Sequence, residues 1–240
     1  MASIVKRVYE KQLAHPPKWA MDNTVLECLT GSVSYGASND TSDMDVFAVC
    51  IPPKREIFPH LYGRIVGFGK QEPRFTQWEK HHIQDKEKQK EYDIKLYNIV
   101  DFINLCMDNN PNMIDQLFCP RNCVLYSTQV GEYLRENRHK FLHKGGWVKF
   151  RGYAYSQMGK IDGKQNSSNP KRKADIEKWG YDLKFAMNVV RLLLEIEEIM
   201  STGDLNLTRN SEVLKSIRRG EWSLEKLSIV TGKQIGRAHV

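Results

Sequence analysis

The sequence predicts an α/β domain followed by a helical domain, divided near residue 125. Short runs of β-branched and apolar residues, bounded by glycine or proline, precede residue 100, whereas helical spacing dominates after residue 120. We therefore expect the first domain at 1–125 and the helical domain at 126–232. Residues 233–240 are expected to be a non-native tail, because their last six residues match the peptide that a common sequencing adapter encodes.

Three segments of the first domain have strand patterns. Residues 24–30 and 44–51 are apolar and β-branched, and Pro52 stops the second run because proline cannot donate to a β-ladder. Residues 92–97 alternate polar and apolar side chains, as in a half-exposed strand. Glycines punctuate 57–82, for which we expect a hairpin or an irregular excursion.

Helical spacing of apolar residues begins at Ile99. It predicts helices at 99–107, 113–118, 128–142, 146–160, 175–201 and 223–231. Residues 161–174 are polar and basic without periodicity, so we expect a mobile loop there.

The composition is that of an ordinary globular protein, with 40% apolar residues. There is no apolar run long enough to cross a membrane and no secretory signal, so we expect a soluble, cytoplasmic protein. The net charge of +7 fits a polyanionic partner, and it fits simple solubility equally well. The five cysteines form no disulfide-type spacing and are expected to be reduced and buried.

A glycine–serine pair precedes two closely spaced aspartates. Gly31 and Ser32 follow the first predicted strand, and Asp43 and Asp45 open the second. Side chains two positions apart on a strand share a face, so both carboxylates can bind one metal centre. Carboxylate oxygens suit Mg²⁺, and two Mg²⁺ ions can activate an attacking oxygen and stabilise a leaving pyrophosphate. Gly31 and Ser32 can hold a triphosphate through backbone N–H groups and a hydroxyl.

This chemistry needs a third carboxylate on a neighbouring strand. Asp93, in the predicted strand 92–97, is the candidate, and Glu91 on the same face is the alternative. Asp93 can also be an ordinary exposed strand acid.

The segments 31–36, 42–46 and 51–53 resemble nucleotidyltransferases of the DNA polymerase β superfamily. More narrowly, the chain resembles a bacterial and phage group associated with RNA repair, and this resemblance continues through 110–118, 184–192 and 219–224. It implies an α+β fold with a small mixed β-sheet, two Mg²⁺ ions, and transfer of a nucleoside monophosphate from an NTP. It assigns metal binding and catalysis to Asp43, Asp45 and Asp93, and phosphate binding to Gly31 and Ser32.

Three further residues are candidates for nucleotide binding. Tyr35 lies in the glycine-rich turn, where it can stack on a base or ribose or pack against the sheet. Lys184 and Arg191 lie on a polar stripe of the last long helix and can face an NTP. The alternative is an exposed helix face on which Arg191 pairs with Glu195. The group pattern has histidines where this helix has Lys184 and its neighbours, which leaves the substrate specificity open.

Other signals are weaker. The spacing of Cys119, Cys123, His139 and His143 is too long for a typical zinc site. His81 and His82 could ligate a metal or serve as a base. We expect surface histidines instead, because the side chains of adjacent strand or helix residues point apart.

We therefore expect a Mg²⁺-dependent nucleotidyltransferase whose acceptor is an RNA end. Modification of a protein hydroxyl, as in toxin–antitoxin nucleotidyltransferases, is the alternative within the enzyme class. A non-catalytic nucleotide or RNA sensor is the alternative outside it, although such a protein has no need for clustered acids beside phosphates.

Overall fold

The computed structural model describes residues 3–38, 44–63, 65, 68–69, 74–161 and 170–236. These residues form two compact units. Within the described residues, unit 1 comprises 3–34, 38–106 and 119–138, and unit 2 comprises 35–37, 107–118 and the chain from residue 139 onward. The chain thus passes between the units several times.

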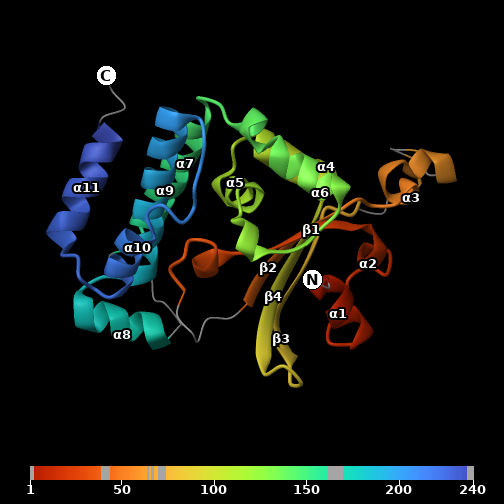
Figure 1. Ribbon diagram of the computed structural model, residues 1–240, viewed down its shortest axis with the longest axis horizontal. Coiled ribbons are helices and arrows are strands. Elements are labelled where there is room, and N and C mark those ends of the chain that lie inside the picture. The colour runs from red at the N-terminus through yellow and green to blue at the C-terminus, as the bar shows by residue number, and fades with distance from the viewer. Residues whose placement is uncertain are drawn as a thin grey trace. The chain divides into compact units, whose positions relative to one another are not determined.

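Unit 1 is built on a five-stranded mixed sheet with the strand order β3-β4-β2-β1-β5 (Figure 1). The strands are β1 (Thr24–Leu29), β2 (Met44–Cys50), β3 (Gln77–Asp85), β4 (Lys90–Asn98) and β5 (Val124–Ser127). β2 and β4 run parallel, whereas the other neighbours are antiparallel. The expected α+β fold with a small mixed sheet is confirmed.

The strands expected at 24–30, 44–51 and 92–97 are confirmed as β1, β2 and β4. The excursion expected at 57–82 is only partly right. It contains the end of α3 (Lys54–Ile57) and the 3₁₀ helix η2 (Pro59–Tyr62), but its last residues begin β3.

Helices cover both faces of the sheet. On one face, alternate residues of β2 and β4, including Val46, Ala48, Ile94 and Leu96, pack with Val5 of α1 (Ile4–Glu10) in a buried core. Burial of the larger side chains, such as Ile94 and Leu96, stabilises the unit by about 1.5–3 kcal/mol each. On the other face, the Phe47 ring lies 5.3 Å from Tyr97 and 5.6 Å from Phe102 of α4 (Ile99–Met107). The other helices among the described residues of this unit are α2 (Ala20–Asn23), the 3₁₀ helices η1 (Gly31–Val33) and η3 (Arg121–Cys123), and α6 (Gln129–Glu136).

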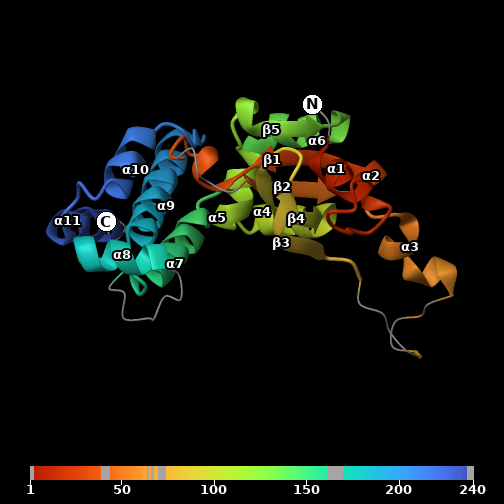
Figure 2. The same ribbon diagram turned by 90° about the horizontal axis from the view of Figure 1, so that it is seen from below.

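Unit 2 is helical (Figure 2). It contains α5 (Pro111–Leu117), α7 (Gly146–Met158), α8 (Pro170–Trp179), α9 (Leu183–Thr202), α10 (Ser211–Arg218) and α11 (Leu224–Gly236), and most of the 3₁₀ helix η4 (Arg138–Phe141). α9 is its centre, since α7, α8, α10 and α11 all pack against it. Its apolar face, including Ala186, Val190 and Ile196, is fully buried.

The helix expected at 128–142 is α6 followed by the short η4. The predictions for 161–201 also need correction. The helix expected at 175–201 is two helices, because Gly180 adopts a φ of +81° after α8 and the Asp182 side chain then caps α9 by accepting from the Lys184 and Phe185 N–H groups. The loop expected at 161–174 is helical from residue 170, where α8 begins. Its residues 162–169 lie outside the described part.

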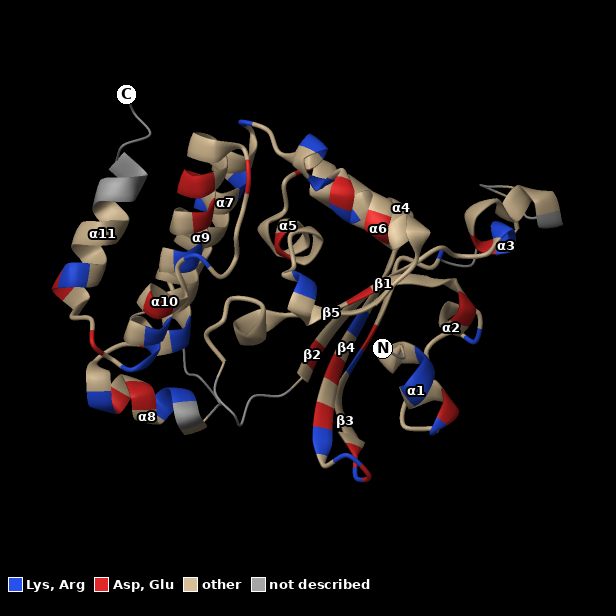
Figure 3. Ribbon diagram, in the orientation of Figure 1, with Lys and Arg blue, Asp and Glu red and all other residues tan. Residues whose placement is uncertain are grey.

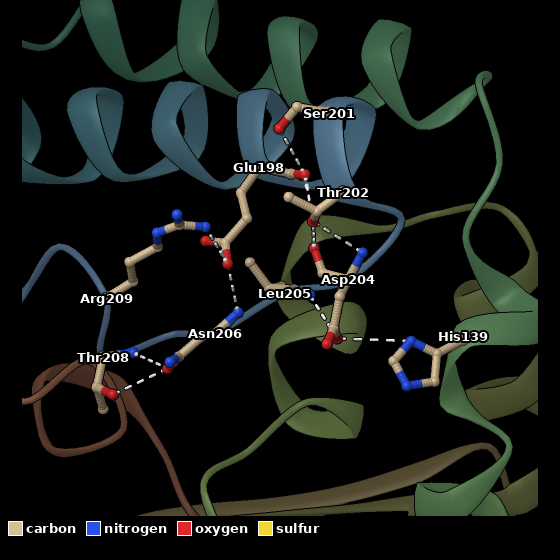
Figure 4. Close-up of polar contacts among 9 residues, drawn as sticks. All are labelled: His139, Glu198, Ser201, Thr202, Asp204, Leu205, Asn206, Thr208 and Arg209. Atoms are coloured by element: carbon tan, nitrogen blue, oxygen red, sulfur yellow. Dashed lines mark hydrogen bonds and ion pairs between the residues drawn. The ribbon is translucent and has the colours of Figure 1, made fainter.

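The end of α9 is fixed by a network of polar contacts (Figure 4). Gly203 ends the helix in a left-handed conformation, with a φ of +70°. The Glu198 carboxylate then accepts from the Asn206 N–H and the Arg209 guanidinium, both at 3.2 Å. These contacts hold the chain that leads to α10.

None of the described helices is long and apolar enough to span a membrane. All five cysteines are buried, as expected, and none of them is in a disulfide bond.

Candidate functional site

Asp45 and Asp93 are direct neighbours in the sheet. They are register partners in the parallel pair of β2 and β4, which places their Cα atoms roughly 4.8 Å apart and both side chains on one face. The adjacent partners Val46 and Ile94 point into the core on the opposite face. Asp45 is exposed, and the Asp93 side chain is 22% exposed. The structure therefore brings together two of the three carboxylates singled out from the sequence.

Asp43, the third carboxylate, lies outside the described residues. Its place beside Asp45 stays a prediction.

Gly31 lies against the Asp45 carboxylate. It begins the short 3₁₀ helix η1 (Gly31–Val33) with a φ of +67°. A Cβ atom at this position would lie 2.7 Å from Asp45 Oδ2, so any other residue would be strained and would collide with the carboxylate. The Thr30 N–H donates to the Asp45 carbonyl at 2.9 Å. The glycine therefore has a steric role beside Asp45, in addition to the phosphate role predicted for it.

The turn after Gly31 is closed locally. The Ser34 N–H and hydroxyl both donate to the Gly31 carbonyl, at 3.1 and 2.9 Å. Ser32, the predicted phosphate ligand, is half-buried within η1.

His81 and His82 face the acids of β4, and the prediction that they point apart is wrong. The register of β3 and β4 shifts between Lys80 and Ile83, so that both histidines oppose the single residue Asp93. This is a β-bulge, in which side chains do not alternate. His82 also has a φ of +56°. As a result, the His81 ring nitrogen Nδ1 lies 2.9 Å from Asp93 Oδ2.

Hydrogen bonds keep Asp93 ionised. The His82 N–H donates to Asp93 Oδ1 at 2.7 Å, and the His81 ring contacts the other oxygen. Partial burial raises the pKa of Asp93, but these hydrogen bonds outweigh burial, and the pKa lies below its usual value. An ionised carboxylate is the form that binds a metal ion.

Glu91, the alternative third acid, lies on the same face of β4 as Asp93. Its Oε1 atom is 2.5 Å from His82 Nδ1. Charged residues of both signs line β3 and β4 in this part of unit 1 (Figure 3).

Tyr35 and Arg191 meet each other inside unit 2. The Arg191 guanidinium carbon lies 4.4 Å from the centre of the Tyr35 ring. The Tyr35 hydroxyl donates to Asp115 at 2.7 Å, and Arg191 Nη1 lies 2.5 Å from Asp115 and 2.9 Å from Glu195. The alternative pairing of Arg191 with Glu195 is confirmed, but these side chains are only 7% and 6% exposed, so the expectation of an exposed helix face is wrong. Lys184 is exposed in the first turn of α9.

This buried cluster holds more acid than base. Burial raises the pKa of Glu195 to about 8, against the opposing effect of Arg191. Burial likewise raises the pKa of Asp115. One guanidinium among two carboxyls therefore favours retention of a proton near neutral pH. Asp115 was not anticipated, because its partner Arg191 is 76 positions away along the chain.

Comparisons with known proteins agree with the resemblance seen in the sequence. The family described as "RNA repair pathway DNA polymerase beta family" matches residues 5–227. An uncharacterized 38.9 kDa protein from the nrdC-mobD intergenic region of Enterobacteria phage T4 is 27% identical over 139 residues, which cover 57% of this chain and 38% of that protein. This chain thus spans less than half of that relative.

Among solved structures, a nucleotidyltransferase-like protein from Exiguobacterium sibiricum 255-15 aligns with 96% of this chain and 77% of its own. The identity is 9% and the TM-score is 0.34.

Proposed function

Because the chain belongs to the RNA repair pathway DNA polymerase β family, we propose that it transfers a nucleoside monophosphate from an NTP to an acceptor hydroxyl. Asp45 and Asp93 would bind Mg²⁺, together with Asp43 from outside the described residues. Two ions would complete the site, as in other two-metal phosphoryl transfer.

The observation that carries this proposal is the shared register of Asp45 and Asp93. Two carboxylates held side by side on one face repel each other unless a cation lies between them. Asp93 is held ionised by its hydrogen bonds, and Asp45 is exposed to solvent. Carboxylate oxygens are the hard donors that Mg²⁺ prefers, and the ion takes its remaining ligands from water and substrate phosphates, so these residues fit the ion.

Each residue has a separate part in the proposed reaction. Asp45 and Asp93 orient the ions, and bound Mg²⁺ would stabilise the charge on the attacking and leaving oxygens. Gly31 lets the backbone approach the triphosphate while leaving room for the Asp45 carboxylate. Ser32 offers its hydroxyl and N–H to the phosphates.

Lys184, Tyr35 and Arg191 are the further residues proposed to contact the nucleotide. Lys184 is exposed in the first turn of α9, and a contact of its ammonium group with a phosphate stays a prediction. Tyr35 and Arg191 are packed on each other and on buried acids, so a nucleotide contact by either would require these contacts to break. Their geometry supports a role in holding unit 2 together.

We propose an RNA end as the acceptor, which the family description and the net charge of +7 both favour. Modification of a protein hydroxyl is the second candidate, because a nucleotide transferred by this chemistry can be accepted by either hydroxyl. A non-catalytic sensor is disfavoured by the paired acids, which bring repulsion without benefit to a protein that only binds nucleotide.

An NTP panel labelled with ³²P at the α-phosphate tests these alternatives. The chain is incubated with each NTP, total RNA and cell protein, with Mg²⁺ or with a chelator. We expect label in RNA, dependence on Mg²⁺, and loss of transfer in the double variant Asp45→Asn, Asp93→Asn. Asp22→Asn, an exposed acid of α2, is the control and should transfer normally. Label in protein would favour the second candidate, and no label with any NTP would contradict enzymatic activity.

A further inference from the structure

His82, Glu91 and Asp93 gather one imidazole and two carboxylates at the bulge between β3 and β4. One ligand atom from each lies within 4.8 Å of the others. We propose that these three residues form a binding site for a divalent transition-metal ion such as Zn²⁺, Co²⁺ or Mn²⁺, next to the all-carboxylate Mg²⁺ site.

The backbone creates this arrangement. Without the bulge, consecutive residues of β3 would point to opposite faces, and only one histidine could face Asp93. The extra residue in β3 and the φ of +56° at His82 bring its ring to the face of Glu91 and Asp93. A positive φ is costly for a residue other than glycine, and such strain is often found at functional sites.

The ligand atoms need little movement to hold an ion. His82 Nδ1 and Glu91 Oε1 are 2.5 Å apart, whereas ligands of a four-coordinate metal stand roughly 3.3 Å apart. A small side-chain rotation would open this gap. The His82 side chain is 77% exposed, so there is room for this rotation, and water or substrate can reach the ring.

The neighbours of the site orient its ligands. The His82 N–H and the His81 ring each contact one oxygen of Asp93, which fixes the plane of that carboxylate. Partners of this kind raise metal affinity by holding a ligand in place. Each carboxylate oxygen has two lone pairs, so Asp93 can still bind an ion while it accepts these hydrogen bonds.

The imidazole distinguishes this site from the proposed Mg²⁺ site. Mg²⁺ prefers oxygen ligands alone, whereas Zn²⁺ and Co²⁺ bind imidazole nitrogen well. Three protein ligands with open positions are typical of sites where a metal meets substrate. The proposal itself does not require nucleotidyl transfer, and it shares only Asp93 with the proposed catalytic site.

Titration of the full chain with Co²⁺ tests this site, because Co²⁺ bound to nitrogen and oxygen ligands absorbs visible light. In the presence of millimolar Mg²⁺ and without nucleotide, we expect one Co²⁺ per chain, displaced by Zn²⁺. His82→Ala and Glu91→Gln should each weaken binding by about 100-fold or more, and His81→Ala by roughly ten-fold. His60→Ala removes an exposed histidine elsewhere in unit 1 and should bind as the native chain does.

Circular dichroism of each variant checks that it folds. Binding that survives in both His82→Ala and Glu91→Gln would overturn the proposal, as would failure of the native chain to bind Co²⁺. Asp45→Asn separates the two sites, because it should abolish nucleotide transfer and leave Co²⁺ binding in place. Co²⁺ binding by a native chain that transfers no nucleotide would support this site and contradict the proposed function.

Discussion

Gly31 and the Asp45 carboxylate lie so close together that a side chain at residue 31 would collide with the carboxylate. A Cβ atom on Gly31 would lie 2.7 Å from Asp45 Oδ2, and the backbone there has a φ of +67°. The glycine that was predicted to approach phosphate thus also keeps the space that the carboxylate occupies.

Replacement of Gly31 by alanine should therefore disturb the position of the Asp45 carboxylate, in addition to straining the backbone at residue 31. We expect Gly31→Ala to displace Asp45 and to lower the transfer rate by about 100-fold, a loss of roughly 3 kcal/mol of transition-state stabilisation. Gly63→Ala is a matched control, because Gly63 has a φ of +75° and nothing within 4 Å of an added Cβ. It should cost about 1 kcal/mol of stability and leave transfer unchanged. Equal transfer rates in the two variants would show that Gly31 has no steric role.

The acids of the site could be predicted from the sequence, but the histidines could not. Asp45 and Asp93 follow from strand alternation and a resemblance in motif. His81 and His82 face β4 only because β3 contains a bulge, and no turn residue in that segment signals it. A non-glycine residue with positive φ is a property of the folded chain that local propensity does not reveal.

At the scale of elements, β3 and α9 each have a feature that sequence patterns do not predict. β3 is an edge strand in which most residues are exposed, so it has no apolar alternation to detect. On α9, Arg191 and Glu195 have the spacing of an exposed ion pair, yet both are buried against Asp115 of α5. A one-dimensional pattern cannot distinguish these cases, since the deciding partner comes from a distant segment.

The buried cluster predicts that Arg191 is essential for stability. Arg191→Met leaves Asp115 and Glu195 buried without a cation, and we expect a loss of about 3–5 kcal/mol in the free energy of unfolding. Lys215→Met removes a cation from an exposed pair on α10 and should cost less than about 1 kcal/mol. Chemical denaturation followed by helical circular dichroism measures both. Similar losses of unfolding free energy in the two variants would show that the buried cluster around Arg191 does not stabilise the protein more than an exposed ion pair does.

The same cluster predicts a pH dependence. Burial raises the pKa of Glu195 from 4.5 to about 8, and Asp115, Tyr35, Arg191 and Glu198 are the charged or titratable groups around it. Between pH 4.5 and about pH 8, the folded state holds a proton on Glu195 that the unfolded state has released. The free energy of unfolding should therefore fall as pH rises through this range. One such proton corresponds to a slope of about 1.4 kcal/mol per pH unit.

Denaturation of native and Glu195→Gln protein at pH 5, 6, 7 and 8 isolates this contribution from that of the histidines. The variant should lose less stability than the native protein across this range. Parallel curves for the two proteins would mean that Glu195 ionises normally in the folded state.

At the scale of the whole molecule, the chain alternates between two compact units. The segments 35–37 and 107–118 belong to the helical unit although strands of unit 1 flank them in the sequence. The sequence predicted β1, β2, β4 and most of the longer helices, but it could not reveal these crossings, because they depend on packing between distant segments. Helix α10 was also missed, whereas most of α9 was predicted, within the helix expected at 175–201, from its apolar spacing.

The charge of the whole chain gives a prediction about the acceptor. If RNA is the acceptor, the net charge of +7 should make its binding sensitive to salt. We expect the apparent KM for RNA to rise steeply between 50 and 200 mM salt, because each phosphate contact to a single strand adds about 0.7 to the logarithmic slope. A KM for RNA that does not change with salt would argue against a polyanionic acceptor.

The transfer rates of Asp93→Asn and Lys95→Gln test the central claim most directly. Both residues lie on the same face of β4, two positions apart, but only Asp93 is paired in register with Asp45. With Mg²⁺ and the NTP that gives the highest incorporation, Asp93→Asn should slow transfer by roughly 10³-fold, whereas Lys95→Gln should transfer at the native rate. Transfer by Asp93→Asn at the native rate would contradict a metal site built on the pairing of β2 with β4.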